Sequence, residues 1–203
     1  MAKSLRETSV AQIRDEAMSA VPRLFTYPDL NDMPADSNRY EIVAGELVVT
    51  PAPRFEHQFV LLNLLEFLKT WLEKEGRWRA VPAPIDLVVG PYDVVQPDIM
   101  VLATSQVKRF REIGIVDLPP RVVVEVVSPG TANIDLRAKL ALYARFGVPE
   151  YWTIDPRTRE MNIFVLESDI YSRLPVAIDG SVASRALPGC MLDTRVVFRE
   201  GDS

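Results

Sequence analysis

Residues 122–155 read VVVEVVSPGTANIDLRAKLALYARFGVPEYWTID, and this stretch decides the fold. It opens with Val122–Val127, an almost wholly β-branched run that is typical of a strand covered on both faces. Helical spacing follows over about Ala132–Phe146, with Gly147 placed as a C-terminal cap. Glu150–Asp155 then returns to a strand pattern. The order strand, helix, strand predicts an α/β or α+β domain whose mixed sheet carries helices on its faces.

The residues before this stretch predict a hairpin and a long helix. Two strand-like runs, Tyr40–Val43 and Glu46–Val49, flank Ala44-Gly45, which is a hairpin signal. From Phe55 onward, apolar residues recur at helical spacing for about 20 residues, and Gly76 is placed to end that helix. The other expected elements are a short helix at Tyr27–Asn31, strands at Arg77–Val81, Ile85–Val89 and Val94–Leu102, and a polar loop at Ala103–Pro120.

The C-terminal residues predict further strands at Met161–Leu166 and Ile170–Leu174, followed by short strands and turns. No repeat or low-complexity linker divides the chain. We therefore expect an N-terminal arm over residues 1–23 and a single domain over residues 24–203. That domain is expected to be a mixed β-sheet core flanked by helices, with an N-terminal hairpin and a C-terminal β extension.

The composition is that of a globular protein. The chain has 203 residues, of which 48% are hydrophobic and 25% charged, which suits one domain with its own core and excludes general disorder. Acidic residues outnumber Lys and Arg by 28 to 23, for a formal net charge of −5. That balance argues against a surface that coats nucleic acid everywhere, and it leaves room for a local basic groove.

Scarce residue types limit the chemistry. Cys190 is the only cysteine and His57 the only histidine, which excludes an internal disulfide, a thiolate zinc site and any site with several imidazoles. A metal site must therefore use carboxylates. The glycines form no phosphate-binding loop motif, so no nucleotide cofactor is expected. No apolar run is long enough to cross a bilayer, and the N-terminal residues carry charges where a signal peptide is apolar, so we expect a cytoplasmic protein without a membrane partner.

Two acids stand out because of their strand contexts. Glu125 is one carboxylate among five valines, and burying it without a partner would cost several kcal/mol. Either a partner, a metal or a cleft compensates it, or it points into solvent near the strand end. Asp98 follows Pro97 and opens the next apolar run, where it is either a turn residue or a second site acid. Two carboxylates on neighbouring strands can bind one hard divalent cation through oxygen.

Lys139 is the third candidate, from its angular position on the predicted helix. At 100° per residue, Leu136, Leu140 and Tyr143 define the buried face, and Lys139 falls beside that stripe. It can either reach back towards the sheet or form a surface pair with Asp135 four residues earlier. A metal held by two carboxylates with an ammonium nearby suits phosphodiester hydrolysis, because the metal activates water and both cations stabilise charge on the phosphate.

In their order along the chain, Gln96-Pro97-Asp98, Glu125-Val126-Val127 and Lys139 resemble the PD-(D/E)XK nuclease superfamily. More narrowly, the chain resembles a bacterial family of uncharacterised restriction endonucleases within it, over roughly residues 24–195. Supporting stretches are Tyr40–Leu47, His57 in the first turn of the long helix, Val124–Pro129 and Tyr143–Asp155. The resemblance implies a restriction-endonuclease-like fold and a DNA endonuclease that uses Mg²⁺ (or Mn²⁺).

The resemblance also assigns roles to particular residues. The usual superfamily lysine position is occupied here by Val127, and in the resembling family the lysine comes from the following helix, which points to Lys139. A fourth acid is implied from the N-terminal part, with Glu41 preferred and Glu46 second; both are otherwise a surface hairpin pair. His57 either contacts phosphate, orients a carboxylate or is a hydrogen-bonded structural residue.

The resemblance also implies DNA and a second copy of the chain as partners. DNA binding needs local positive charge, and Lys108, Arg109 and Arg111 are the first candidates, with Arg39 among several further ones. Enzymes of restriction type usually cut as symmetric dimers, so a homodimer is expected. The alternative function is a nucleic-acid or protein binding module that keeps the nuclease fold without cleavage.

Overall fold

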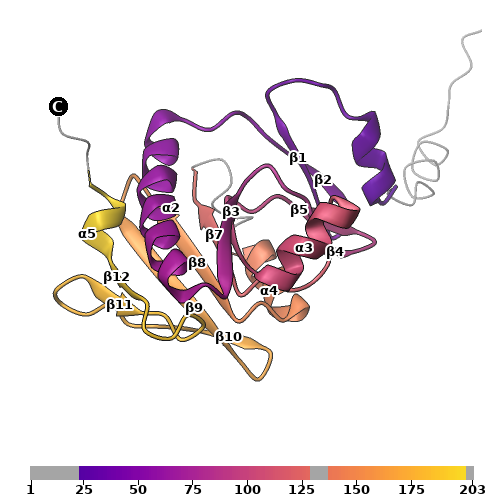
Figure 1. Ribbon diagram of the computed structural model, residues 1–203. Coiled ribbons are helices and arrows are strands. Elements are labelled where there is room, and N and C mark those ends of the chain that lie inside the picture. Colours follow the sequence, from indigo (N-terminus) through magenta and orange to yellow (C-terminus); the bar gives the residue numbers. More distant parts are fainter. Residues whose placement is uncertain (1–22, 129–136, 200–203) are drawn as a thin grey trace, which may run out of the picture.

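The computed structural model describes residues 23–128 and 137–199 (Figure 1). The N-terminal arm expected over residues 1–23 therefore lies almost wholly outside the described residues, as does the start of the helix expected from Ala132. No helix among the described residues is long and apolar enough to cross a membrane.

The main sheet has six strands and contains the deciding stretch. Their spatial order is β10 (Ile170–Arg173), β9 (Glu160–Glu167), β8 (Glu150–Asp155), β7 (Val122–Val126), β6 (Ile99–Ala103) and β3 (Trp78–Pro82). Strands β7 and β8 are parallel and all other neighbours are antiparallel, so the predicted mixed sheet is confirmed. The parallel pair needs a crossover, and α4 (Lys139–Phe146) belongs to it, ending at Gly147.

A second, four-stranded sheet comes from the N-terminal half. Its order is β2 (Glu46–Thr50), β1 (Arg39–Val43), β5 (Asp93–Val95) and β4 (Leu87–Gly90). The predicted β1–β2 hairpin is confirmed, with Ala44 and Gly45 both at positive φ (53° and 79°), as a two-residue hairpin turn requires. The short helix before it, η1, is a 3₁₀ helix over Tyr27–Asp32.

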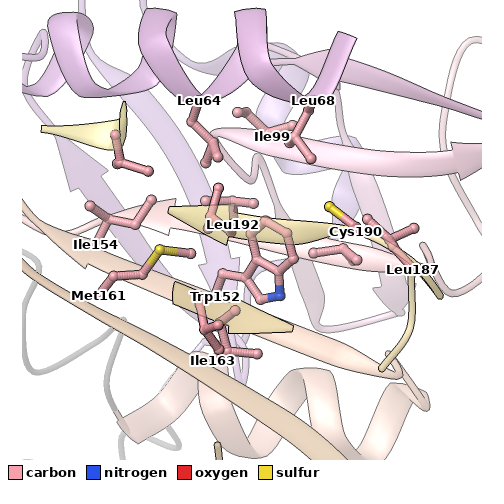
Figure 2. Packing of buried hydrophobic residues seen from close by; sticks show 14 of the residues in the cluster. Leu64, Leu68, Ile99, Trp152, Ile154, Met161, Ile163, Leu187, Cys190 and Leu192 are labelled. Atoms are coloured by element: carbon pink, nitrogen blue, oxygen red, sulfur yellow. The ribbon is translucent and has the colours of Figure 1, made fainter. Parts of the chain in front are cut away.

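Apolar side chains fill both faces of the main sheet. Alternate residues of β7 face opposite ways, with Val122 and Val124 in one cluster and Val123 in the other. The first cluster lies under α2 (Phe55–Glu75), the long helix predicted from its spacing, and Figure 2 shows Leu64 and Leu68 of α2 above this face of the sheet. The C-terminal pair β11 (Ser181–Ala183) and β12 (Met191–Asp193), followed by α5 (Thr194–Val197), completes that cluster.

The second cluster lies on the other face of the main sheet. It contains Leu142 and Tyr143 of α4, together with Val43, Leu87 and Val95 from the smaller sheet. Helices α2 and α4 therefore approach the end of β7 from opposite sides of the sheet. This arrangement lets one strand end receive side chains from both layers.

Two sequence predictions were wrong in this region. The expected polar loop over residues 103–120 contains a helix, α3 (Thr104–Ile113). Its first turn is held by the Gln106 side chain, which accepts a hydrogen bond from the Ala103 N–H (2.8 Å), and Gly114 ends it in the left-handed conformation. The expected strand Val94–Leu102 is divided into β5 and β6 by Gln96-Pro97-Asp98, so its two halves enter different sheets.

Candidate active site

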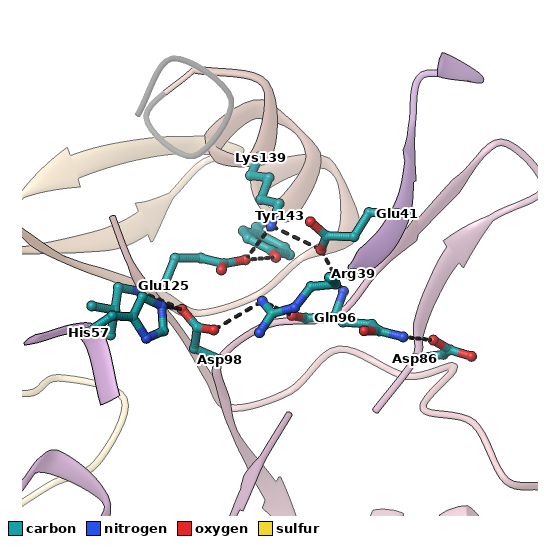
Figure 3. Close-up of polar contacts among 10 residues, drawn as sticks. Arg39, Glu41, His57, Asp86, Gln96, Asp98, Glu125, Lys139 and Tyr143 are labelled. Carbon is teal, nitrogen blue, oxygen red and sulfur yellow. Dashed lines mark hydrogen bonds and ion pairs between the residues drawn. The ribbon is translucent and has the colours of Figure 1, made fainter. Parts of the chain in front are cut away.

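Four ionisable side chains meet where the two sheets adjoin (Figure 3). Glu41 comes from β1, Asp98 immediately precedes β6, Glu125 lies near the end of β7, and Lys139 begins α4. Each of these residues is only 2% exposed. Burial of such groups is tolerated where each has a partner of opposite charge: Lys139 pairs with Glu41 and Glu125, and Asp98 pairs with Arg39.

The strand register explains why Asp98 and Glu125 meet. Strands β6 and β7 pair Ile99 with Val124 and Met100 with Val123. Continuing this antiparallel register by one residue places Asp98 across from Glu125. The expectation that Glu125 might simply point into solvent is wrong, because β7 is buried along its whole length.

Lys139 joins two of the acids. Its Nζ lies 2.9 Å from Glu125 Oε1 and 3.0 Å from Glu41 Oε1. The lysine therefore reaches back towards the sheet, as its helical angle predicted. The alternative, a surface pair with Asp135, does not fit a lysine that is 2% exposed, although Asp135 itself is outside the described residues.

Tyr143 is a partner that the sequence reasoning treated only as an apolar core residue. It lies one helical turn after Lys139, and its hydroxyl donates a hydrogen bond to Glu125 Oε1 (2.7 Å). Burial, together with the Glu125 charge, raises the pKa of Tyr143 well above its ordinary value. The phenol therefore stays protonated and acts as a permanent donor to the carboxylate.

Asp98 is held by cations and by a backbone amide. Its Oδ1 accepts from Arg39 Nη1 (3.0 Å), and its Oδ2 accepts from the Val126 N–H (2.8 Å) and lies 3.1 Å from His57 Nε2. Burial alone would raise the pKa of Asp98. The His57 hydrogen bond, the charges of Arg39 and His57 and the Val126 amide together lower it below its ordinary value. Asp98 is therefore ionised at neutral pH.

His57 orients a carboxylate, one of the three roles expected from the sequence. It comes from the first turn of α2 and reaches Asp98 from the side of the sheet opposite to α4. Its other ring nitrogen, Nδ1, is buried and has no hydrogen-bond partner among the described residues. Because the ionised Asp98 carboxylate can only accept, Nε2 donates to it, and the unpaired Nδ1 sets His57 apart from an ordinary core histidine.

Gln96 locks the segment that carries Asp98. Its N–H donates to Glu41 Oε1 (2.7 Å), and its carbonyl oxygen accepts from Arg39 Nη1 (3.0 Å). Arg39 therefore binds both the backbone of this segment and the Asp98 carboxylate. Sequence reasoning had treated Arg39 only as one of several DNA contacts, because its partners lie far away along the chain.

The structure does not bring every candidate to this place. Glu46 is exposed at the start of β2, across the hairpin from Val43. Lys108, Arg109 and Arg111 lie on α3, which follows the far end of β6 from Asp98, and Arg109 forms an ion pair with Asp117. Any contact of these three residues with DNA would therefore lie away from the acids.

The donor set fits one hard divalent cation. Within residues 23–128 and 137–199, no three His, Cys, Asp or Glu side chains are grouped as a metal cage. Mg²⁺ does not need such a cage, because it usually takes one or two carboxylates and completes its shell with water and substrate phosphate. Asp98 and Glu125, which face each other across two strands, supply that minimal pair.

The mixed sheet, the Pro97-Asp98 pair, Glu125 and the cation beside it define a restriction-endonuclease-like protein of the PD-(D/E)XK type. Residues 27–195 match the model of the Uma2 family, described as "Putative restriction endonuclease", and the chain belongs to that family.

A solved structure has the same fold. It is a crystal structure described as that of "a putative nuclease belonging to DUF820" from Anabaena variabilis ATCC 29413. The two chains superpose with a TM-score of 0.72 at 17% sequence identity, covering 86% of this chain and 97% of the other. A search of curated proteins found no match.

Proposed function

We propose that this protein is a metal-dependent DNA endonuclease that hydrolyses phosphodiester bonds. The observation that carries the proposal is the position of Asp98 across from Glu125, one residue beyond the Ile99–Val124 pair of β6 and β7, with Lys139 Nζ 2.9 Å from Glu125. Two facing acids and a buried ammonium are the groups that this reaction needs, and the chain's family is described as restriction endonucleases.

The residues divide the chemistry between them. A Mg²⁺ or Mn²⁺ ion held by Asp98 and Glu125 would supply Lewis acidity and a water of lowered pKa. Lys139 holds Glu125 in place and stabilises negative charge that develops on the phosphate. Arg39 offers a second, partly exposed cation for a phosphate oxygen, with 22% of its side chain exposed. His57 keeps the Asp98 carboxylate oriented, and Glu41 positions Lys139.

DNA is the proposed substrate and Mg²⁺ the proposed ion. The protein is proposed to work in the cytoplasm as a homodimer, since a two-fold axis matches a palindromic target.

A binding module without cleavage is the second candidate. Two observations favour it: the chain has a net charge of −5, and every acid at the site already contacts a cation of the protein. In such a protein, Lys139 and Arg39 stay paired with the acids permanently and no metal enters. Such a protein would bind its partner equally well with Glu125 changed to Gln.

The deciding experiment compares three purified proteins on mixed DNA substrates in Mg²⁺ and in Mn²⁺. They are the wild type, Glu125→Gln and the control Glu167→Gln, which changes an exposed acid near the end of β9. We expect cleavage by wild type and control, and a rate at least about 100-fold lower for Glu125→Gln, because metal and charge stabilisation supply several kcal/mol. Equal cleavage by all three would exclude this site as the source of activity. Absence of cleavage by the wild type in both metals would favour the binding module.

Metal binding gives an independent check. Titration of Mn²⁺ into the wild-type protein, followed by its paramagnetic signal, should show a site that Asp98→Asn weakens at least about tenfold. Unchanged Mn²⁺ binding in Asp98→Asn would remove Asp98 from the metal site.

A further inference from the structure

A polar cavity of about 320 Å³ lies directly beside the candidate active site. Arg39 and Gln96, which hold Asp98 and Glu41, also line this cavity. Its other polar walls include Tyr27 and Asn31 of η1, Tyr40 of β1 and Asp86. Nothing in the proposed hydrolysis uses these four residues.

The contacts of Gln96 connect the two places. Its backbone N–H binds Glu41 at the active site (2.7 Å), and its side-chain amide donates to Asp86 Oδ1 in the cavity wall (2.8 Å). Figure 3 shows this path, with Asp86 and Gln96 on the side of Arg39 away from His57. A molecule that enters the cavity therefore has one end near Arg39 and Asp98 and the other near Asp86.

The two ends of the cavity suit different chemical groups. Arg39 lines the cavity with a partly exposed side chain, and a guanidinium is the group that binds phosphate oxygens best. At the other end, Asp86 accepts from Gln96 and from the Tyr27 hydroxyl (2.8 Å). Burial and the hydrogen bond and charge of Asp86 raise the pKa of Tyr27 to about 12, so this phenol stays a donor. Asp86 keeps lone pairs for a further donor, such as the exocyclic amino group of adenine, cytosine or guanine.

We infer that the cavity is the binding site for one unstacked nucleotide of the substrate strand, with its phosphate at Arg39 and its base at Asp86. A cavity of about 320 Å³ suits a single nucleotide and is too small for stacked base pairs. The aromatic rings of Tyr27 and Tyr40 offer surfaces on which a base can stack. This inference rests on the proposed function and narrows its substrate to single strands or to duplexes from which one nucleotide is extruded.

Two tryptophan substitutions in η1 test the cavity without touching the catalytic groups. Asn31 is exposed and lines the cavity, whereas its neighbour Asp32 is exposed and does not. The probes are dAMP, dCMP, dGMP and dTMP without metal, with binding followed by ligand-observed NMR. We expect Asn31→Trp to weaken binding of dAMP, dCMP and dGMP at least about tenfold by filling the cavity, and Asp32→Trp to leave it within about twofold. Equal binding by Asn31→Trp, or no binding of any nucleotide by the wild type, overturns the inference.

Base preference tests the role of Asp86. The wild type should bind dCMP at least about fivefold more tightly than dTMP, because thymine has no exocyclic amino group. Asp86→Asn keeps the shape of the side chain but removes its charge and replaces one acceptor oxygen by an NH₂ group, so it should reduce this preference to about twofold or less. A wild-type protein that binds dTMP as tightly as the other three nucleotides contradicts the assignment of Asp86.

Two further measurements test whether the bound nucleotide belongs to a DNA strand or is a free nucleotide. They also distinguish a failure of this inference from a failure of the proposed function. Single-stranded oligonucleotides that contain one abasic position should bind less tightly than intact ones; equal binding overturns the assignment to the substrate strand. In cleavage assays, Asn31→Trp should raise KM with kcat nearly unchanged. Cleavage with an unchanged KM overturns the cavity assignment while the nuclease function stands. A third outcome is that the wild type binds nucleotides but cleaves no DNA, and that Asn31→Trp abolishes the binding. This outcome supports the cavity and overturns the proposed hydrolysis.

Discussion

Two buried glutamates lie on neighbouring parallel strands of the main sheet, at opposite ends of it. Glu125 is near the end of β7, and Glu150 is the first residue of β8, where it pairs with Val122. Glu125 contacts the ammonium of Lys139 and the hydroxyl of Tyr143. Among the described residues, the hydrogen-bond donors to Glu150 are all uncharged: Trp152 Nε1 (2.9 Å), Ser184 Oγ (2.8 Å) and the backbone N–H groups of Arg185 and Ala186.

The difference shows how one sheet uses the same side chain for two purposes. The donors around Glu150 are mostly fixed in the backbone or in packed side chains, and they attach the C-terminal segment to β8. The cation beside Glu125 ends a flexible side chain, and its charge can be shared with a metal-bound phosphate. Neutral donors therefore mark a structural carboxylate here, and cationic donors mark one that can exchange partners.

Removing the cation at the β7 end should have the largest effect. Lys139→Met keeps the aliphatic length and removes the ammonium that contacts both Glu41 and Glu125. We expect a loss of about 3–5 kcal/mol in the free energy of unfolding at pH 7, measured by urea denaturation. Lys108→Met, on the exposed side of α3, is the control and should change stability by less than about 0.5 kcal/mol. A loss below about 1 kcal/mol for Lys139→Met would mean that the ion pairs are not what holds these acids.

Weakening the Glu150 acceptor at the β8 end should have the second-largest effect on stability. Glu150→Gln replaces one acceptor oxygen by an amide NH₂, which faces donors that it cannot satisfy. The expected loss is about 2–3 kcal/mol, with DNA cleavage per folded molecule unchanged. Glu167→Gln, which breaks only the exposed ion pair with Arg185, should cost less than about 0.5 kcal/mol. If Glu150→Gln reduced the cleavage rate of folded protein, the structural reading of this end would be wrong.

The pH dependence of Asp98 should distinguish the two ends further. The pKa of Asp98 is lowered in the folded protein, so its stabilising contribution is present above its ordinary pKa of 3.8 and is lost as pH falls below it. Asp98→Asn should therefore cost about 2 kcal/mol at pH 7, and its deficit relative to wild type should shrink steadily in urea titrations below about pH 4. A deficit that is constant from pH 7 to pH 3 would contradict an ionised Asp98.

The smallest expected effect belongs to the neutral donor at the β7 end. Tyr143→Phe removes the hydroxyl that donates to Glu125 and preserves the ring in its core. We expect a loss of about 1 kcal/mol in thermal or urea unfolding. Tyr40→Phe, whose hydroxyl binds the exposed Asp36, should cost less than about 0.5 kcal/mol. A loss for Tyr143→Phe as large as that for Lys139→Met would show that the hydroxyl, and not the ammonium, is the main partner of Glu125.

The residues at the β7 end were largely predictable because local patterns carry them. A lone acid in a β-branched run and a lysine at the border of a helical stripe are visible within a few residues, and the facing position of Asp98 follows once β6 and β7 are paired. Arg39 and the hydroxyl of Tyr143 were not assigned to the site. Their roles depend on contacts with Asp98 and Glu125, and no local sequence pattern indicates those contacts.

The role of Glu150 at the β8 end was not predictable, because most of its partners lie far from it along the chain. Glu150 looks like an ordinary first residue of a strand, and its partners Ser184 to Ala186 lie 34 to 36 positions later in a segment without clear periodicity. Helix α3 escaped prediction because its N-terminus is capped by the side chain of Gln106, three residues inside, with alanine at the cap position itself. Contacts that close long loops leave little trace in local sequence.

The attachment of residues 184–186 to Glu150 also has a consequence for synthesis. A ribosome completes Glu41, Asp98, Glu125 and Lys139 well before it adds the segment that satisfies Glu150 and packs Leu192 onto the sheet. Until that segment emerges, Glu150 lacks the donors of residues 184–186 and keeps the Trp152 indole, and the cluster under α2 is open on one side. A nascent chain therefore carries the four side chains of the candidate site before it can hold them in a fixed geometry.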